Sequence, residues 1–509
     1  MTHSTDSTAN DELFLGIDVG TSGVKAVLMR RDGHVAATAL APLLLSTPRP
    51  GWAEQDPEAW WDATVVAVRD VLSKLHNARV LSIGVSGQMH SSVFLDRREQ
   101  VIRPALLWCD GRTTAECAEI TTRAGGESNL RHWVRNPALE GFTLPKVLWL
   151  RNHEPDAYRQ LSKVLLAKDF IRLRLTGTLA TEPSDASGTL MYDPAGQRWS
   201  EELLRAVDVP MQLLPDVGAS SQVLGRLSSL AARITGLEEH TPVVGGGADN
   251  ACGAAGVGVI TPGEAVASWG TSGTVLAPTA QPLVDPALRA HTFCHVAPGV
   301  WYLMGVVLSA GGAFSWYREN FAREGDGTSV SAALLDDEAA KIAPGAEGVT
   351  FLPYLQGERT PHRDASARGA FLGLSLAHSR SHLTRAVIEG VCFAMRDSFS
   401  ILRELGLSPS SLLLTGGGAK SSLLRRLQAE IYGVPVTTVN REEGPAYGAA
   451  LLAAVGVGAF ADLATAARET LARAPIEEPA VGAHAQYDDA YARFRAAYGA
   501  LRMARCVIP

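Results

Sequence analysis

The chain has 509 residues, of which 46% are hydrophobic and 19% charged, with a formal net charge of −7. This composition excludes an intrinsically disordered chain. It also argues against nucleic acid as a partner, because no excess of basic residues is available to replace phosphate counterions. At about 150 residues per domain, the length predicts about three domains or two large ones.

The six cysteines stand singly, without a CxxC pair or a nearby histidine at zinc-ligand spacing, so we expect reduced thiols. The N-terminal stretch MTHSTDSTANDE is polar and does not resemble a secretory signal. We expect it to be a frayed tail. Apolar runs break at glycine or charge well before the ~18 residues of a membrane helix. We therefore expect a cytoplasmic protein without a membrane partner.

The N-terminal part predicts a layered α/β domain. Strands are expected at residues 13–18 and 24–30, joined by the turn GTSG, and a third strand at HVAATAL. From residue 56, an aspartate cap precedes apolar positions at helical spacing, and VLSIGVSGQ is typical of a buried strand. A hairpin followed by a helix and a further strand indicates layers of helix and sheet.

Asp18 ends the first apolar run, just before the GTSG turn. Consecutive backbone amides in such a turn form a concave site for phosphate oxygens, and glycine tolerates the positive φ that aims the amides inward. A carboxylate beside phosphate requires a hard cation such as Mg²⁺ between them. An Asp-initiated hairpin turn explains this segment equally well. The phosphate interpretation assigns Asp18 to the metal and Thr21 and Ser22 to the nucleotide.

Polar side chains follow the strand VLSIGVSGQ and recur in LLWCDGR. They are Gln88, His90, Ser91, Ser92, Trp108, Asp110 and Arg112. This set suits a pocket for a polyol better than one for an apolar ligand. A single histidine is more often structural and a tryptophan more often part of the core. Only the clustering of these residues therefore favours a substrate site.

The segment VVGGGADNACGAAG supplies the candidate catalytic residue. Asp249 follows a strand and a glycine turn, at or near the start of a helix of small residues, where the helix dipole favours an ionised carboxylate. Such a carboxylate can accept the proton of a sugar hydroxyl that attacks a γ-phosphoryl group, which is worth about 10²–10⁴ in rate. An N-cap aspartate is the alternative. Asn250 is placed to orient the same hydroxyl.

The segment EAVASWGTSGTVLA, from Glu264, repeats the pattern of strand, GTSG and strand. Four small residues can recur by chance in a chain with 49 glycines. The matching strands on both sides favour a repeated fold instead. The repeat therefore predicts two related halves with a cleft between them. The segment expected to cross from one half to the other is VGGGADNACGAAGVGVITPGEA.

Two later segments are also conspicuous. The polar loop in FLPYLQGERTPHRDASARGAF follows an apolar run, and it either borders an active site or is simply solvated. LLLTGGGAKSSLLRRLQAEI predicts a strand, three glycines and an amphipathic helix whose N-terminus is suited to a nucleotide. A plain strand-to-helix turn would need fewer glycines. GxxxxGK[ST] and GxGxxG are both missing, so nucleotide binding must use another fold.

Together these segments resemble the FGGY carbohydrate kinase family, and within it most closely the xylulokinases. The similarity covers roughly residues 13–456, including GWAEQDPEAWW, SGQMHSSVFLD, FLPYLQGERTPH and EEGPAYGAALLA. It implies two ribonuclease-H-like α/β domains of the actin and hexokinase type around a central cleft. Residues 12–255 would hold the sugar, the first phosphate loop and the catalytic aspartate, and residues 256–509 the nucleotide.

The implied activity is phosphorylation of D-xylulose to D-xylulose 5-phosphate with ATP and Mg²⁺. Glycerol, gluconate and ribulose are the alternative sugars, and an actin-like or chaperone-like ATPase is the alternative class. The sugar and ATP are the expected partners. The sequence itself does not indicate an oligomeric state, and a homodimer is the assembly to be tested.

The resemblance also assigns site residues. Asp249 is the expected catalytic base, and Asp18 is expected to assist it by holding Mg²⁺ and the phosphates. The expected sugar contacts are Met89, His90, Trp108, Asp110 and Asn250. The expected nucleotide contacts are Thr21, Ser22, Gly270, Thr271, Gly311, Gly417 and Gly418. Leu424 and Arg426 stand where xylulokinases often have tryptophan and glutamine. The adenine contact is therefore left open, and no site is expected beyond about residue 460.

Overall fold

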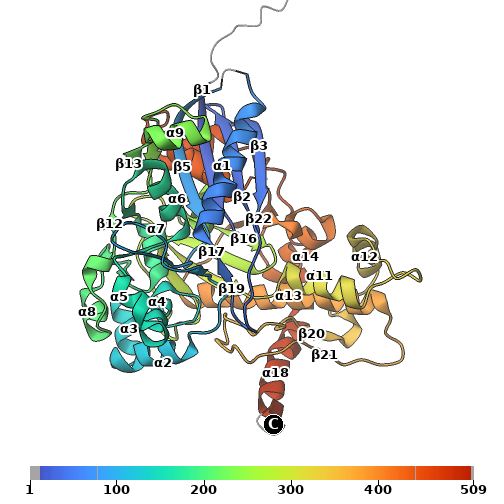
Figure 1. Cartoon of the computed structure of the whole chain (residues 1–509). Helices are drawn as coiled ribbons and strands as arrows, with labels where there is room; N and C mark the ends of the chain where they lie inside the picture. The colour runs from blue at the N-terminus through green and yellow to red at the C-terminus, as the bar shows by residue number, and fades with distance from the viewer. Residues whose placement is uncertain (1–11, 77, 442, 506–509) are drawn as a thin grey trace, which may run out of the picture.

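The computed structural model describes residues 12–76, 78–441 and 443–505. The frayed tail predicted at the N-terminus falls on residues 1–11, outside this description. Two open sheets organise the described residues, one in each half of the chain (Figure 1). No helix among these residues is both long enough and apolar enough to cross a membrane.

The first sheet has the strand order β13-β14-β5-β1-β2-β3, with β15 also paired to β5. β3, β2 and β1 run antiparallel, whereas β5 and β14 continue the sheet parallel to β1. Its strands are β1 (Glu12–Val19), β2 (Gly23–Arg30), β3 (Val35–Pro42), β5 (Arg79–Gly87), β13 (Val223–Arg226), β14 (Pro242–Val244) and β15 (Gly247–Ala248).

The second sheet has the order β18-β19-β17-β16-β22-β23. Here too, three antiparallel strands (β19, β17, β16) are followed by two parallel ones (β22, β23). Its strands are β16 (Glu264–Trp269), β17 (Gly273–Thr279), β18 (His291–Cys294), β19 (Trp301–Val307), β22 (Ser411–Gly416) and β23 (Val436–Thr437). Each GTSG turn joins the first two strands of its sheet, so the repeat predicted from the tetrapeptide is a repeat of fold. The predicted α/β class with two ribonuclease-H-like halves is confirmed.

Helix α1 (Pro57–Ser73) covers one face of the first sheet against β2 and β3. It begins as predicted, because Asp56 Oδ1 accepts the N–H of Glu58 at 3.0 Å. The other helices of this half are α2 (Thr114–Arg123), α3 (Glu127–Trp133), α4 (Thr143–His153), α5 (Pro155–Gln160), α6 (Ala167–Thr176), α7 (Pro183–Ala186), α8 (Glu201–Ala206) and α9 (Ser229–Thr235).

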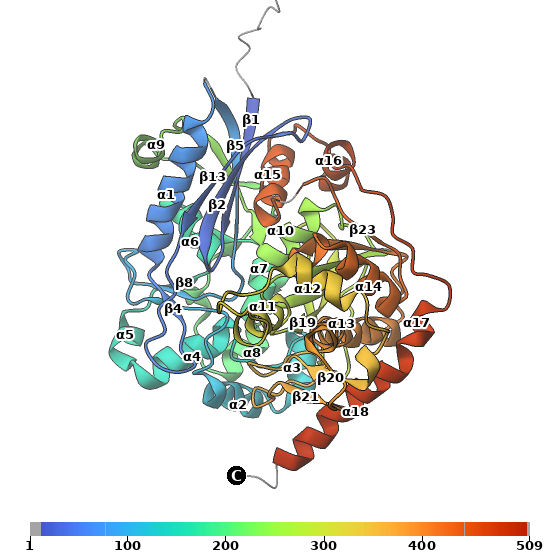
Figure 2. The same ribbon diagram turned by 90° about the vertical axis from the view of Figure 1, so that its right-hand side faces the viewer.

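Two helices connect the halves. α10 (Asp249–Gly256) follows the first sheet, and α15 (Pro445–Gly456) comes from the second half but packs on β1 and β5 of the first (Figure 2). Their approach requires glycine. A Cβ on Gly84 would lie 2.0 Å from the Ala449 carbonyl oxygen, and one on Gly448 would lie 1.9 Å from that of Cys252. Backbone therefore packs directly on backbone where the halves meet.

The remaining helices come from the second half of the chain. α13 is buried along most of its length and packs against β19, β17 and α14. These helices are α11 (Gly311–Asn320), α12 (Ala332–Ala339), α13 (Arg380–Glu404), α14 (Ser422–Tyr432), α16 (Leu463–Thr470), α17 (Ala483–Gln486) and α18 (Asp488–Arg505). The C-terminal helix α18 packs against the short strand β20 (Thr350–Leu352) at the base of Figure 1.

Candidate active site

A cavity of about 760 Å³ lies between α10 and the second sheet. It is lined by the first residues of α10 and α15, by β16, β17 and β22, and by the turn after β22. Two helix N-termini thus border it, and the positive ends of the helix dipoles favour an anion. Its polar lining comes from Asn250, Ser268, Thr274, Thr415, Lys420, Thr438 and Arg441. Both the volume and the donors suit a nucleotide.

Asp249 is the first residue of α10 and is partly exposed to this cavity. It is not the N-cap, which is Ala248. Its Oδ1 accepts the backbone N–H of Asn250 at 2.7 Å and the Asn250 amide at 2.9 Å. Burial and then the charge of Asp18 raise the pKa of Asp249 to about 7, against hydrogen bonds from Asn250 and the Met89 backbone that lower it. A carboxylate with a pKa near neutral is suited to exchange a proton with substrate.

Asp18 lies near the end of β1, close enough for its charge to act on Asp249. Burial raises the pKa of Asp18 to about 6, and a side-chain hydrogen bond from Ser86 and then the charge of Lys25 oppose that rise. Among the described residues, no group donates a hydrogen bond to its buried Oδ1. An unpartnered carboxylate oxygen beside a second carboxylate is the type of ligand that Mg²⁺ prefers. The residues therefore fit a metal held by Asp18 with water completing its shell.

The first GTSG turn faces the sugar-side residues through its threonine. Thr21 Oγ1 donates to Gln88 Oε1 at 3.1 Å and accepts the Trp108 indole N–H at 3.0 Å. The Ser22 carbonyl accepts the N–H of Leu43 at 2.9 Å, which ties the turn to the end of β3. The structure thus brings Thr21 and Trp108 together, with the Thr21 hydroxyl already engaged.

The second GTSG turn receives the start of α11. Gly311 N–H donates to the Gly270 carbonyl at 2.8 Å, and the N–H groups of Ala310 and Gly312 donate to the Thr271 carbonyl. A Cβ on Gly311 would lie 2.5 Å from the Gly270 oxygen, so glycine is required there for packing. Gly270, Thr271 and Gly311 lie together, beyond the lining of the 760 Å³ cavity but joined to it through Ser268 and Thr274.

The three glycines after β22 differ from the prediction in one respect. α14 does not follow them directly, because a 3₁₀ turn (Gly417–Ala419) intervenes and Ser421 caps the helix by accepting the N–H of Leu424. The prediction that the helix follows the three glycines directly is therefore wrong, and the nucleotide role of this segment stays a prediction. Gly417 lines the cavity, whereas a Cβ on Gly418 would lie 2.7 Å from the Trp269 Cβ. Gly418 is thus needed for packing beneath the cavity.

His90 is buried beside the Phe142 ring, with 4.8 Å between ring centroids. Its Nδ1 contacts the Gly188 carbonyl, which can only accept, so Nδ1 carries the proton and Nε2 is left as an acceptor. Burial and then the charge of Arg359 lower the pKa of His90 well below its usual range. The backbone has φ = 69°, and the His90 carbonyl accepts Lys146 Nζ at 3.0 Å. His90 is therefore a neutral acceptor held in a strained conformation.

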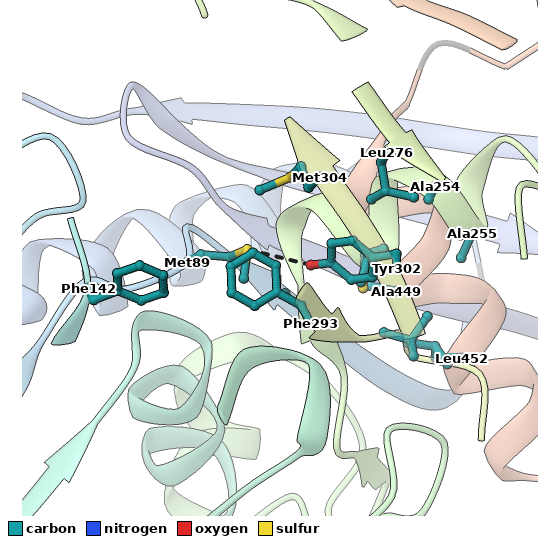
Figure 3. Packing of buried hydrophobic residues seen from close by; sticks show 14 of the residues in the cluster. Met89, Phe142, Ala254, Ala255, Leu276, Phe293, Tyr302, Met304, Ala449 and Leu452 are labelled. Carbon is teal, nitrogen blue, oxygen red and sulfur yellow. Dashed lines mark hydrogen bonds between the residues drawn. The ribbon is translucent and has the colours of Figure 1, made fainter. Parts of the chain in front are cut away.

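Met89 is buried, and Figure 3 shows its sulfur facing the Tyr302 hydroxyl, beside Phe293 from the other half. The Asn250 amide is 3.6 Å from the same sulfur. Figure 3 also shows Phe142 further along the same buried cluster. The Met89 side chain thus joins the two halves, and its backbone N–H is the group that reaches Asp249.

Asp110 is buried in an ion pair. Its two carboxylate oxygens share the single Arg112 Nε–H, at 2.9 and 3.0 Å, and one of them also accepts Nη2 at 2.7 Å and the Ala53 N–H at 2.6 Å. The Arg112 guanidinium also stacks over Trp52, 3.5 Å from the ring centroid. The structure therefore places Asp110 in a buried ion pair two residues after Trp108. A direct contact with sugar stays a prediction.

Sequence reasoning missed part of the wall of the cavity. Thr438, Val439 and Arg441 line the cavity, as does Gly444 before α15. The motif EEGPAYG was the available signal, since Gly444 has φ = 59° and Pro445 opens a helix. Leu424 is buried in the core of the second half and Arg426 is exposed, and neither lines the cavity.

The match to known sequences covers both halves. Residues 13–256 match the N-terminal domain of the FGGY family of carbohydrate kinases, and residues 265–457 match its C-terminal domain. This chain belongs to the FGGY family of carbohydrate kinases. As a kinase of this family, it acts on a sugar with ATP.

The kinase is 40% identical over 491 residues to the xylulose kinase of Escherichia coli strain K12, covering 96% of this chain and 98% of the relative. It superposes on the structure of a xyloylose kinase from Brucella ovis with a TM-score of 0.89 at 37% identity, covering 97% and 100% of the two chains. It is also similar to a gluconate kinase from Lactobacillus acidophilus, with a TM-score of 0.90 at 28% identity over 96% and 98%. The fold alone therefore does not identify the sugar.

Proposed function

We propose that this kinase transfers the γ-phosphoryl group of ATP to the C5 hydroxyl of D-xylulose, giving D-xylulose 5-phosphate and ADP. The observation that carries the proposal is the place of Asp249. It opens α10 at the edge of the nucleotide-sized cavity, and it is hydrogen-bonded to the Met89 backbone next to His90. The identity to xylulose kinases over nearly the whole chain supports the choice of sugar.

In this mechanism Asp249 accepts the hydroxyl proton as the sugar oxygen attacks the γ-phosphorus in line with the leaving ADP. Asn250 holds the Asp249 carboxylate, and neutral His90 offers Nε2 to a sugar hydroxyl. Asp18 would hold Mg²⁺, which, when bound to ATP, neutralises charge on the phosphates. Closure of the two halves would exclude water and so limit hydrolysis of ATP.

A sugar panel tests the proposal. ADP release is measured with D-xylulose, D-ribulose, D-gluconate and glycerol, with and without the Asp249→Asn change. We expect the largest kcat/KM for D-xylulose and only slow ATP hydrolysis without sugar. A larger kcat/KM for another sugar would reassign the substrate. Rapid hydrolysis without sugar that survives Asp249→Asn would instead support a sugar-independent ATPase.

A further inference from the structure

The polar loop in GERTPH crosses from the second half to the sugar side of the first. Arg359 Nη2 donates to the Trp108 carbonyl at 3.4 Å, and a Cβ on Gly141 would lie 2.3 Å from the same nitrogen. Gly141 therefore leaves the space that the guanidinium occupies. Burial and then the charge of Arg359 lower the pKa of both His90 and His291. The guanidinium thus lies on the His90 side of the expected sugar pocket.

No ion pair within 4.0 Å involves this cation in the part of the chain that the structure describes, although it is partly buried and the charges of Glu140 and Glu358 act on it. Its one side-chain hydrogen bond, to Trp108, uses one of five N–H donors. Arg363, four residues on, is different, because it pairs with Glu127 of the first half at 2.8 Å. No Arg359 nitrogen is both buried and without a partner, so its unused donors are open to solvent and available to the acceptor oxygens of a ligand.

The loop is held rigidly from the other side by the C-terminal helix. The Tyr498 ring of α18 stacks on His362 at 3.5 Å between centroids, and its hydroxyl donates to Asp364 at 2.8 Å. Tyr354 is also within hydrogen-bond distance of His362, at 3.2 Å. These contacts fix the residues that follow Arg359, so its position is set before any ligand binds. Preorganisation of this kind reduces the entropic cost of binding.

We propose that Arg359 is a specificity-determining contact for the sugar, donating from the second half to the C1 hydroxyl and C2 carbonyl oxygens of an open-chain ketose. Asp249 is assigned to the opposite end of the same substrate, at the C5 hydroxyl. A guanidinium fork matches two neighbouring acceptor oxygens, whereas a lysine ammonium at this site would act as a point charge. This inference rests on the function proposed above.

The test compares Arg359→Met with Arg363→Met, a matched control in the same loop that also reaches the first half. We expect Arg359→Met to lower kcat/KM for D-xylulose by about 10- to 100-fold, the range for a hydrogen bond to a charged group, mainly through KM for the sugar. KM for ATP should stay within about twofold of the unaltered enzyme, since Arg359 lies outside the nucleotide cavity. The kcat/KM of Arg359→Lys should lie between those of the unaltered enzyme and Arg359→Met. Added guanidinium chloride at millimolar concentration should restore part of the Arg359→Met activity.

A second arm uses 1-deoxy-D-xylulose, which lacks the C1 hydroxyl. Arg359→Met should lower kcat/KM by a smaller factor on this substrate than on D-xylulose, because one of the two acceptor oxygens is already absent. Equal losses on both sugars, or unchanged KM for D-xylulose in folded Arg359→Met, would overturn the inference. Thermal unfolding of both variants shows whether they fold. If the unaltered enzyme phosphorylates another sugar better, the proposed function fails first, and Arg359 is then tested on that sugar.

Discussion

Replacing Asp249 by asparagine should reduce activity and increase stability together. The change keeps the shape of the side chain and its place beside Asn250 but removes the ability to accept a proton. We expect kcat to fall about 10²- to 10⁴-fold, with KM for the sugar little changed. In the unaltered enzyme kcat/KM should fall as the pH drops through about 7, the pKa of Asp249, and this acid limb should disappear in Asp249→Asn.

The stability gain follows from linkage. Because the folded-state pKa of Asp249 is raised from 3.8 to about 7, the folded protein binds this proton more tightly than the unfolded chain. Stability is therefore lost as the pH rises from about 4 to 7, and Asp249→Asn avoids that loss. At about 1.36 kcal/mol per pH unit the limit is about 4 kcal/mol at pH 8. Water in the cavity screens a partly exposed carboxylate, so we expect Asp249→Asn to raise the free energy of unfolding at pH 8 by about 1–3 kcal/mol.

Calorimetry at pH 5 and pH 8, with a chelator and without ATP, measures this difference. Unfolding entropy scales with length, so for a chain of 509 residues about 1 kcal/mol corresponds to about 1 °C in Tm. Asp337→Asn, at an exposed carboxylate on α12, is the matched control and should change neither Tm nor kcat. Retention of more than about a tenth of kcat, or a Tm at pH 8 no higher than that of the unaltered enzyme, would refute the reasoning.

Three further changes test the packing and the metal site. Gly448→Ala should lower the free energy of unfolding, measured by calorimetry, by about 3 kcal/mol or more, since its Cβ would meet a carbonyl oxygen at 1.9 Å. Gly499→Ala, in open space on α18, should raise the free energy of unfolding by about 0.5–1 kcal/mol. Equal effects of the two changes would contradict the close approach of α15. Asp110→Asn should lower the free energy of unfolding in urea by about 3 kcal/mol, because it breaks the buried pair with Arg112, and no change would show that the pair is not stabilising. Asp18→Asn should raise the Mg²⁺ concentration for half-maximal rate by about tenfold or more, and an unchanged Mg²⁺ titration would exclude Asp18 from the metal site.

Local patterns determined much of what the sequence predicted. The first strands, the helix after Asp56 and the two GTSG turns follow from apolar periodicity and turn residues within a few positions of each other. The repeated turn also indicated the duplicated fold, because the same tetrapeptide joins equivalent pairs of strands in the two sheets. The placement of Asp249 at the start of α10 is local in the same way.

Only the tertiary structure decided how distant segments use one another. Asp110 pairs with Arg112 and reaches Ala53, Gly418 packs on Trp269, and α15 crosses to the first sheet. Arg359 extends across to the carbonyl of Trp108, which lies 251 positions earlier in the chain. No local pattern encodes such contacts, because a side chain's partners depend on how the two sheets are brought together. The sequence by itself therefore determined which chemistry the chain carries, and the packing of its two halves decided which residues face the substrates.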